Sequence, residues 1–178
     1  MAGLRLNLGC GRDVKLEGYV NIDIKETPIT DMVTGAGDLS AFEDGSVDEI
    51  RAIHLIEHLS EIDAYHALHE WYRALKPGGT LWVECPNYIK VFQHLLSQKP
   101  NTPHWRRYWT GLWGTVYEGK TTPAGRILSS GCAHKWLYCP ESLSEIVKEA
   151  GFTDIVILGP SCHRQDRDMR LNAIKPEE

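Results

Sequence analysis

The stretch LNLGCGR at residues 6–12 constrains the fold of this chain more than any other. Leucines at alternating positions up to Leu8 predict a short buried strand. Gly9 and Gly11 follow directly, and glycine permits tight backbone conformations and lets a ligand approach the main chain. We therefore expect a ligand-binding turn at the end of the first strand.

Asp23 lies twelve residues after Gly11, at the end of a second apolar stretch that begins at Tyr19. A carboxylate at the tip of the second strand, beside a glycine turn, is suited to binding the two hydroxyls of a ribose. A dinucleotide-binding turn would need a third glycine, where this chain has Val14, and about 20 residues before the acid. The pattern favours a nucleoside ligand without pyrophosphate and disfavours a nucleotide-dependent oxidoreductase. A turn beside an exposed acid that binds nothing is the alternative.

Strands and helices alternate along most of the chain. Ser60 begins a capping box, Pro140 suits a first helical position, and Pro77-Gly78-Gly79 is expected to end the helix after Ser60. The apolar face of that helix is predicted to comprise Tyr65, Leu68, Tyr72 and Leu75. Further strands are predicted at residues 31–34, 47–53, 80–85, 152–158 and 171–175. The order indicates an α/β protein with a mostly parallel sheet and an antiparallel hairpin at one edge.

The composition is that of an ordinary soluble protein. A length of 178 residues, with 42% hydrophobic residues, suits one domain with a full core. No apolar run approaches the length of a membrane span, and strand one begins at once, so we expect a cytoplasmic protein without a signal peptide or membrane partner. The five cysteines form no Cys-x-x-Cys pair and are interpreted as reduced thiols. Cys132, His134, Cys139 and His163 match no common zinc spacing, so we expect no metal site.

Charge is distributed unevenly, because residues 86–136 are basic within a chain of net charge −5. This segment is rich in aromatic residues, shows no clear alternation of strand and helix, and has one acid, Glu118, against seven cations: Lys90, Lys99, Arg106, Arg107, Lys120, Arg126 and Lys135. Either this segment binds a substrate, or it is a lid whose aromatic residues form a satellite core or a dimer surface.

With these features in view, the chain resembles the class I S-adenosylmethionine-dependent methyltransferases, in particular a small bacterial group, the type 11-like methyltransferases, often linked to sugar and polysaccharide pathways. The resemblance is carried by LNLGCG (6–11), NIDI (21–24), GDL (37–39), VDEIRAIHLIEHL (47–59), LKPGGTLWVE (75–84) and PESLSEIVKEAGF (140–152). It implies a Rossmann-like, seven-stranded, mostly parallel sheet whose last strand is antiparallel. Residues 1–178 would form one methyltransferase domain, with a substrate-lid insertion at about 87–136.

The resemblance also implies S-adenosylmethionine as cofactor and S-adenosylhomocysteine as product. The turn would hold the methionine part, Asp23 the ribose and Asp38 the adenine amino group, with Leu39 packed on the ring and Ile53 beside the sulfonium. The implied cofactor-binding residues are Leu8, Gly9, Cys10, Gly11, Asp23, Ile24, Asp38, Leu39 and Ile53. The chain departs from the family at Asn7, often an acid, and at Asp13, often a glycine, so the contacts to the methionine amino and carboxyl groups are less well defined.

Methyl transfer depends mainly on aligning the acceptor with the methyl–sulfur bond, and a base is needed only if the acceptor must lose a proton. His54 follows the fourth strand, and a neutral imidazole near pH 7 suits such a base. The alternative is that His54 merely lines the pocket or caps a helix. Glu57 is expected to be a supporting carboxylate, and His58 a hydrogen-bonded structural histidine.

The basic segment favours a small anionic acceptor, such as a nucleotide-linked or phosphorylated sugar, because aromatic rings stack on sugars and guanidinium groups pair with phosphate. The candidate acceptor contacts are Tyr88, Trp105, Arg106, Arg107, Tyr108, Trp109, Arg126 and His134. An RNA-directed methyltransferase is less favoured, because the cations form one patch in an acidic protein. A cofactor-binding pseudoenzyme or partner subunit is a further alternative, and a homodimer is compatible with the pattern.

Overall fold

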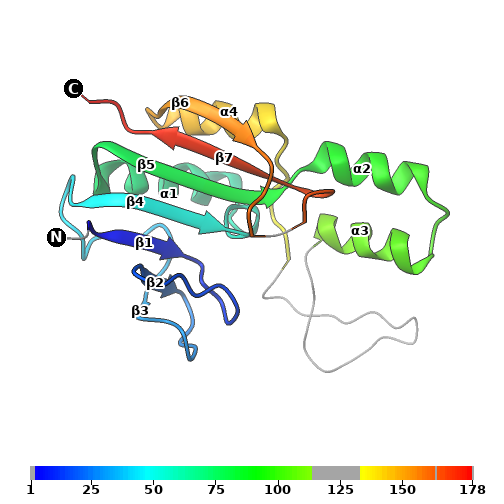
Figure 1. The fold of residues 1–178 in the computed structure, drawn as a ribbon, viewed down its shortest axis with the longest axis horizontal. Coiled ribbons are helices and arrows are strands. Elements are labelled where there is room, and N and C mark those ends of the chain that lie inside the picture. The colour runs from blue at the N-terminus through cyan, green and yellow to red at the C-terminus, as the bar shows by residue number, and fades with distance from the viewer. Residues whose placement is uncertain (1–2, 114–132, 163, 178) are drawn as a thin grey trace.

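A seven-stranded sheet, with strand order β3-β2-β1-β4-β5-β7-β6, organises the molecule (Figure 1). The computed structural model describes residues 3–113, 133–162 and 164–177. The strands are β1 (Arg5–Leu8), β2 (Val20–Asp23), β3 (Met32–Val33), β4 (Val47–Ile53), β5 (Leu75–Pro86), β6 (Thr153–Leu158) and β7 (Asp168–Ile174). The pairs among β1 to β5 are parallel, and β7 is antiparallel to both β5 and β6. The predicted sheet, including its antiparallel edge hairpin, is confirmed.

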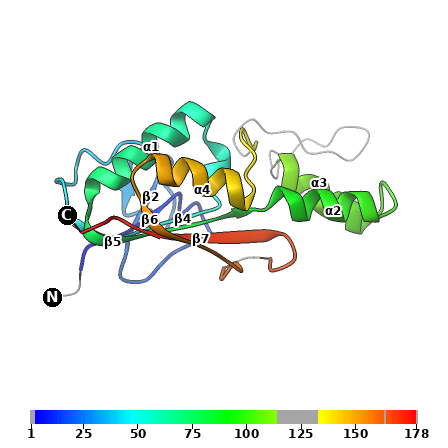
Figure 2. The same ribbon diagram turned by 90° about the horizontal axis from the view of Figure 1, so that it is seen from above.

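Helices α1 (Glu61–Ala74) and α4 (Pro140–Glu149) pack on the same face of this sheet (Figure 2). Ser60 caps α1 by accepting from the Asp63 amide at 3.1 Å, and Pro140 begins α4, as predicted. The main core lies between these helices and the sheet, and includes Trp71, which is fully buried. No helix in the described ranges is both long and apolar enough to cross a bilayer.

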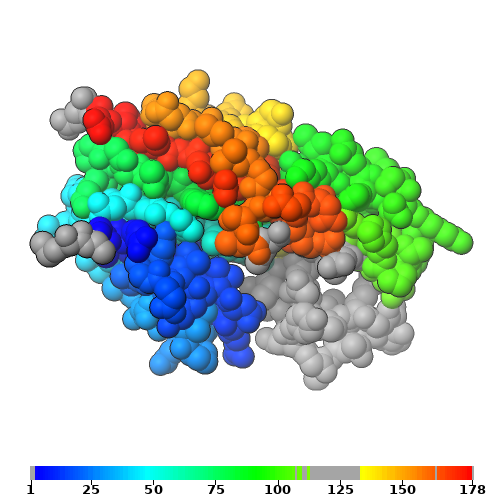
Figure 3. Space-filling model, in the orientation of Figure 1, coloured from blue at the N-terminus to red at the C-terminus, as the bar shows by residue number. Residues whose placement is uncertain are grey.

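The opposite sheet face, turned to the viewer in Figures 1 and 3, is covered by side chains of its own strands. Trp82 on β5 lies between two cations, with the Arg51 guanidinium 4.0 Å and the Arg170 guanidinium 4.2 Å from its ring centroid. Arg5 lies 4.6 Å from the Tyr19 ring centroid in the same way. Guanidinium groups stacked on aromatic rings thus shield a face that, over the described residues, has no helix against it.

Two buried asparagines hold the crossover between β1 and β2, where the described backbone forms only turns. Asn7 Nδ2 donates to the Val14 carbonyl at 2.6 Å and to Asn21 Oδ1 at 2.8 Å. Asn21 also accepts from the Leu16 amide at 2.9 Å and donates to Asp31 Oδ2 at 2.9 Å. These bonds satisfy backbone groups that a helix would otherwise satisfy internally, which explains how so short a crossover is ordered.

Two details of α1 and β5 differ from the sequence prediction. The helix ends at Ala74, and Leu75 already pairs with Val47 as part of β5. The register then shifts between Val47 and Glu49, so the Lys76–Gly79 segment forms a bulge within β5. Tyr65, expected on the apolar face, is 45% exposed, because Trp71 occupies the centre of that face.

The basic segment contains two helices, contrary to the prediction that it lacks regular structure. Helices α2 (Tyr88–Ser97) and α3 (Pro103–Trp113) extend beyond the end of the sheet in Figures 1 and 2. Asn87 caps α2 by accepting from the Ile89 amide at 3.0 Å. A second apolar cluster holds the pair together: Tyr88, Val91, Leu95, Tyr108 and Leu112, with Trp105 packed against it. The satellite-core alternative therefore describes the buried aromatic residues of this segment.

Substituting Asn21→Leu should lower the free energy of unfolding by roughly 2–4 kcal/mol, because it leaves the Leu16 amide without its partner and removes one of the two hydrogen bonds donated by Asn7 Nδ2. Urea denaturation of the variant and the wild type measures this. Gln93→Leu, on the exposed side of α2, is the control and should change stability by less than about 0.5 kcal/mol. Equal effects of the two substitutions would contradict the role assigned to Asn21.

Candidate active site

The glycine turn lies where the strand order reverses. The chain forms β1, β2 and β3 in one direction across the sheet and then places β4 on the other side of β1. Open α/β sheets bind ligands at such a point, outside the carboxyl ends of the strands. Gly9 has φ +71° and Gly11 has φ +57°. A Cβ at residue 9 would lie 2.9 Å from the Leu55 side chain, so glycine there also lets the turn pack against the segment after β4.

Asp23 is fixed beside this turn by backbone amides. The Gly11 amide donates to Asp23 Oδ2 at 2.9 Å, and the Lys25 amide donates to Oδ1 at 2.9 Å. Each carboxylate oxygen can accept a second hydrogen bond, so both can still receive a hydroxyl group. A Cβ on Gly11 would meet no atom within 4 Å, so open space adjoins the carboxylate. The turn and the acid singled out in the sequence are thus in direct contact.

The other candidate cofactor residues differ widely in exposure. Ile24 is 72% exposed, and Asp38 is exposed, with Oδ1 accepting from the Ser40 amide at 3.2 Å. Leu39 is fully buried in the main core, so it does not present its side chain to a ligand as expected. Leu8, Cys10 and Ile53 are also at most 2% exposed, so their side chains do not face a ligand.

His54, the first residue after β4, links three segments of the chain. Its φ of +51° is unusual for a residue other than glycine, and such backbone conformations concentrate at functional sites. Its amide donates to the Glu84 carbonyl at 2.7 Å. Its Nδ1 lies 2.8 Å from Glu57 Oε1 on the short helix η1 (Ile56–His58), and its Nε2 lies 3.2 Å from Asp168 Oδ2 at the start of β7.

The two carboxylates determine the charge of His54. Burial alone would lower its pKa, but the hydrogen bonds to Asp168 and Glu57 outweigh burial and raise the pKa to about 9. Burial would raise the pKa values of both carboxyl groups, yet the hydrogen bonds of His54, and those of Arg167 to Asp168, hold them below the usual range. His54 is therefore a cation near pH 7, whereas the sequence suggested a neutral base.

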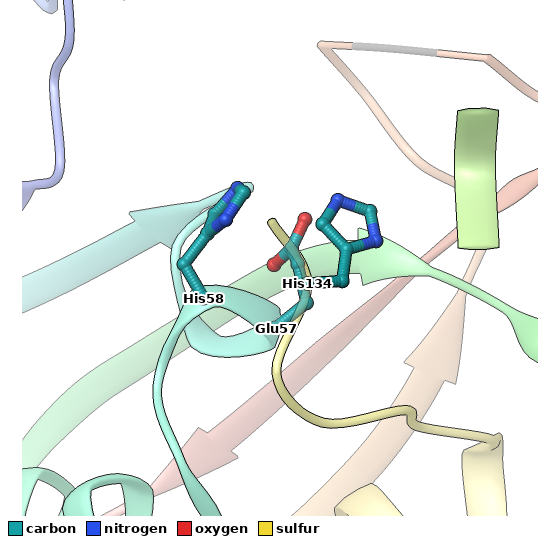
Figure 4. A group of neighbouring side chains, drawn as sticks. All are labelled: Glu57, His58 and His134. Atoms are coloured by element: carbon teal, nitrogen blue, oxygen red, sulfur yellow. The ribbon is translucent and has the colours of Figure 1, made fainter. Parts of the chain in front are cut away.

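Glu57 also faces two further histidines (Figure 4). Its carboxylate lies between the imidazoles of His58 and His134, and one polar atom from each of the three residues lies within 4.8 Å of the others. His58 Nδ1 lies 3.2 Å from the Ala133 carbonyl, and the two imidazole centroids are 4.9 Å apart. Burial lowers the pKa of His134 to about 4, so its ring is neutral near pH 7. His134, expected at the acceptor site, is part of this cluster.

Two of the predicted acceptor residues are buried. Tyr88 is 6% and Tyr108 is 0% exposed, and the Tyr108 hydroxyl donates to Asp166. These rings hold α2 and α3 together and against the loop before β7, and they do not present a surface to a ligand. The structure differs here from the prediction because an aromatic residue at helical spacing in a basic segment packs between helices as readily as it faces solvent.

Other predicted acceptor residues are accessible on α3. Trp105 and Trp109 stack with ring centroids 4.9 Å apart and an interplanar angle of 16°, and Trp109 is 41% exposed. Arg106 is exposed. Two predicted acceptor contacts lie outside the described residues: the Arg107 side chain and the whole of Arg126. Cys132 and His163, which their spacing in the sequence disfavoured as zinc ligands, also lie outside them.

Sequence reasoning missed Asp168, although it contacts His54 directly. Asp168 is fully buried, but it follows a polar loop and precedes a strand, and no local pattern distinguishes it from a surface acid. The two residues His54 and Glu57 are only three positions apart in the sequence, although His54 precedes η1. Glu57, expected at a helix terminus or as a supporting carboxylate, lies in η1 with Oε1 2.8 Å from His54 Nδ1.

The charge of His54 makes stability depend on pH. A pKa raised from 6.5 in the unfolded chain to about 9 stabilises the fold fully below pH 6.5, and the effect is lost as pH rises through 9. The free energy of unfolding should therefore fall by up to roughly 3 kcal/mol between pH 6.5 and 9. Chemical denaturation across this range should show the fall in the wild type and in the exposed control His66→Gln, but not in His54→Gln. Equal slopes in all three proteins would show that the imidazole is not a buried cation.

Comparison with known proteins agrees with this geometry. Residues 6–83 match a family model described as a methyltransferase domain. A SAM-dependent methyltransferase from Archaeoglobus fulgidus aligns with a TM-score of 0.63 and 17% identity, over 98% of this chain and 86% of that chain. One from Methanosarcina mazei aligns with a TM-score of 0.62 and 18% identity, over 98% and 92%. No curated protein sequence matches the chain.

A third structure, phosphoethanolamine N-methyltransferase 2 of Haemonchus contortus in complex with S-adenosyl-L-methionine, aligns with a TM-score of 0.56 and 15% identity, over 99% of this chain and 49% of that chain. At these identities the solved structures establish the fold. The family match spans the glycine turn, Asp23 and the end of β4. The chain therefore has the fold of the S-adenosylmethionine-dependent methyltransferases, and its residues 6–83 match the methyltransferase domain family.

Proposed function

We propose that this methyltransferase binds S-adenosylmethionine at the carboxyl ends of β1, β2 and β3 and methylates a small anionic acceptor, such as a nucleotide-linked or phosphorylated sugar. The observation that carries the cofactor site is the 2.9 Å hydrogen bond from the Gly11 amide to Asp23 Oδ2. It leaves lone pairs on the carboxylate for the ribose hydroxyls. The open space beside Gly11 fits the methionine part, so the residues present suit this cofactor.

Two exposed apolar side chains would hold the adenine. Ile24 directly follows Asp23, and Val33, which is 55% exposed, is the register partner of Asp23 on β3. Exposed apolar residues beside the proposed ribose contact suit the faces of a purine ring. Asp38 would accept from the adenine amino group. Ile24 and Val33 thus take the stacking role that the sequence assigned to Leu39.

When bound, S-adenosylmethionine supplies an electron-poor methyl carbon, and the protein must align the acceptor with it and exclude water. We assign His54 to positioning, because a protonated imidazole held by two carboxylates cannot take a proton from the acceptor. It fixes the corner between β4 and η1. If His54 were instead the general base, it would first have to lose its proton, and the rate would rise with pH up to about 9.

The acceptor would bind beside α3. A series of polar contacts supports this placement: the Tyr108 hydroxyl donates to Asp166, Arg164 pairs with Asp166 at 2.8 Å, and the Arg164 amide donates to Asp168 Oδ2 at 3.1 Å. Because Asp168 contacts His54, α3 is connected to the end of β4. The stacked Trp105–Trp109 pair would pack on a sugar or base, and Arg106 would bind a phosphate or carboxylate.

Asp23→Asn should weaken S-adenosylhomocysteine binding at least tenfold, because the amide carries no charge and offers one acceptor oxygen in place of two. Isothermal titration calorimetry should show micromolar or tighter binding to the wild type and no binding of NAD. Glu17→Gln, an exposed acid elsewhere in the β1–β2 crossover, should bind like the wild type. A folded wild type that binds no S-adenosylhomocysteine would refute the proposed cofactor site.

Formation of S-adenosylhomocysteine in the presence of nucleotide-linked sugars, sugar phosphates and uncharged sugars tests the acceptor. We expect turnover with anionic acceptors only, and Arg106→Gln should raise KM roughly tenfold through loss of a charge-assisted hydrogen bond. Lys99→Gln, an exposed cation between α2 and α3, is the matched control and should leave KM unchanged. Equal turnover of uncharged sugars would exclude an anionic acceptor. Cofactor binding without any turnover would favour the partner-subunit alternative.

A further inference from the structure

Glu57, His58 and His134 converge although neither the proposed cofactor site nor the proposed acceptor site uses them as contacts (Figure 4). Glu57 and His58 belong to η1, and His134 lies in the segment that precedes α4. The Glu57 carbonyl accepts from the Lys135 amide at 2.8 Å and from the Trp136 amide at 3.3 Å. These backbone hydrogen bonds hold the two segments together and so keep the three residues close to one another.

Only one of the two carboxylate oxygens of Glu57 has a hydrogen-bond partner among the described residues. Oε1 is hydrogen-bonded to His54, whereas Oε2 is buried and has no hydrogen-bond partner among the described residues. Glu57 is 2% exposed, so bulk water does not solvate this oxygen. A buried carboxylate oxygen without a partner is unfavourable, and a donor or a cation is needed beside it.

His58 is oriented as a metal ligand would be. Its Nδ1 lies 3.2 Å from the Ala133 carbonyl, and because a carbonyl only accepts hydrogen bonds, Nδ1 carries the hydrogen and donates. The lone pair of this ring is therefore on Nε2. Histidines that bind metals characteristically donate their other ring N–H to a backbone carbonyl or carboxylate in this way.

We propose that Glu57, His58 and His134 bind a divalent zinc ion through one carboxylate oxygen and two imidazole nitrogens. Two histidines and a glutamate form a known zinc ligand set that leaves a fourth position for water or substrate. Imidazole ligands favour zinc over magnesium or calcium, which prefer oxygen ligands.

The observed spacing requires only a small closure of the cluster. Tetrahedral ligands about 2.1 Å from zinc lie roughly 3.4 Å from one another, and one possible ligand atom from each of the three residues lies within 4.8 Å of the others. Rotation of the side chains can supply the difference. His134 also lines an open pocket of about 370 Å³ with Lys135, Trp136 and Leu137, so the fourth position can face this pocket.

The test is titration of the full chain, stripped with EDTA and free of cofactor, with ZnCl2 in a calorimeter. We expect one ion per chain with a micromolar or lower Kd, and His58→Ala and His134→Ala should each weaken binding at least 100-fold. His66→Ala, on the exposed side of α1, should bind like the wild type. Substituting cobalt for zinc should give the intense visible absorption of a tetrahedral site in the wild type and in His66→Ala only.

Equal zinc affinity in His134→Ala and the wild type would overturn the proposal, and so would octahedral cobalt spectra in the wild type. Far-UV circular dichroism checks that each variant is folded, and Glu57→Gln, which keeps the shape of the side chain, provides a fourth variant that should lose binding. Since no S-adenosylhomocysteine is present, failure of zinc binding leaves the proposed cofactor site untouched. Asp23→Asn should in turn bind zinc normally.

Discussion

The partly buried imidazolium of His54, held by two carboxylates, is the interaction on which the rest of the site depends. It joins the end of β4, the short helix η1 and the start of β7. An isolated charge in this position would be strongly destabilising, but Glu57 and Asp168 balance it, and Arg167 pairs with Asp168 in turn. Because Glu57 and Asp168 come from different segments, the network fixes the geometry at the carboxyl end of the central strands.

The sheet is covered by helices on one face, and this shapes the cofactor side of the site. With α1 and α4 on the same face, the opposite face is shielded by guanidinium–aromatic contacts around Trp82. The crossover from β1 to β2 is too short for a packed helix, so Asn7 and Asn21 order it through side-chain hydrogen bonds. Buried side-chain amides therefore order the crossover that follows the glycine turn, while open space adjoins the turn at Gly11.

Features that depend on residues close together along the chain were predictable from the sequence. The glycine turn and Asp23 could be paired because two successive parallel strands end at the same edge of a sheet, and Ser60 and Pro140 begin helices for local reasons. Helices α2 and α3 were missed because their apolar residues pack mainly against each other in a small cluster, and the basic composition hid this spacing. Leu39 was misplaced because only the position of α1 decides that it is buried.

The sequence by itself determined the order of the strands, the starts of α1 and α4, the turn with its acid, and the resemblance to methyltransferases, because periodicity and spacing along the chain specify these. Only the tertiary structure decided the chemistry of the histidines. The charge of His54 depends on Asp168, more than a hundred residues away, and the cluster around Glu57 depends on His134. The pKa and the ligand-binding capacity of a side chain arise from burial and from partners in space, which spacing along the chain does not encode.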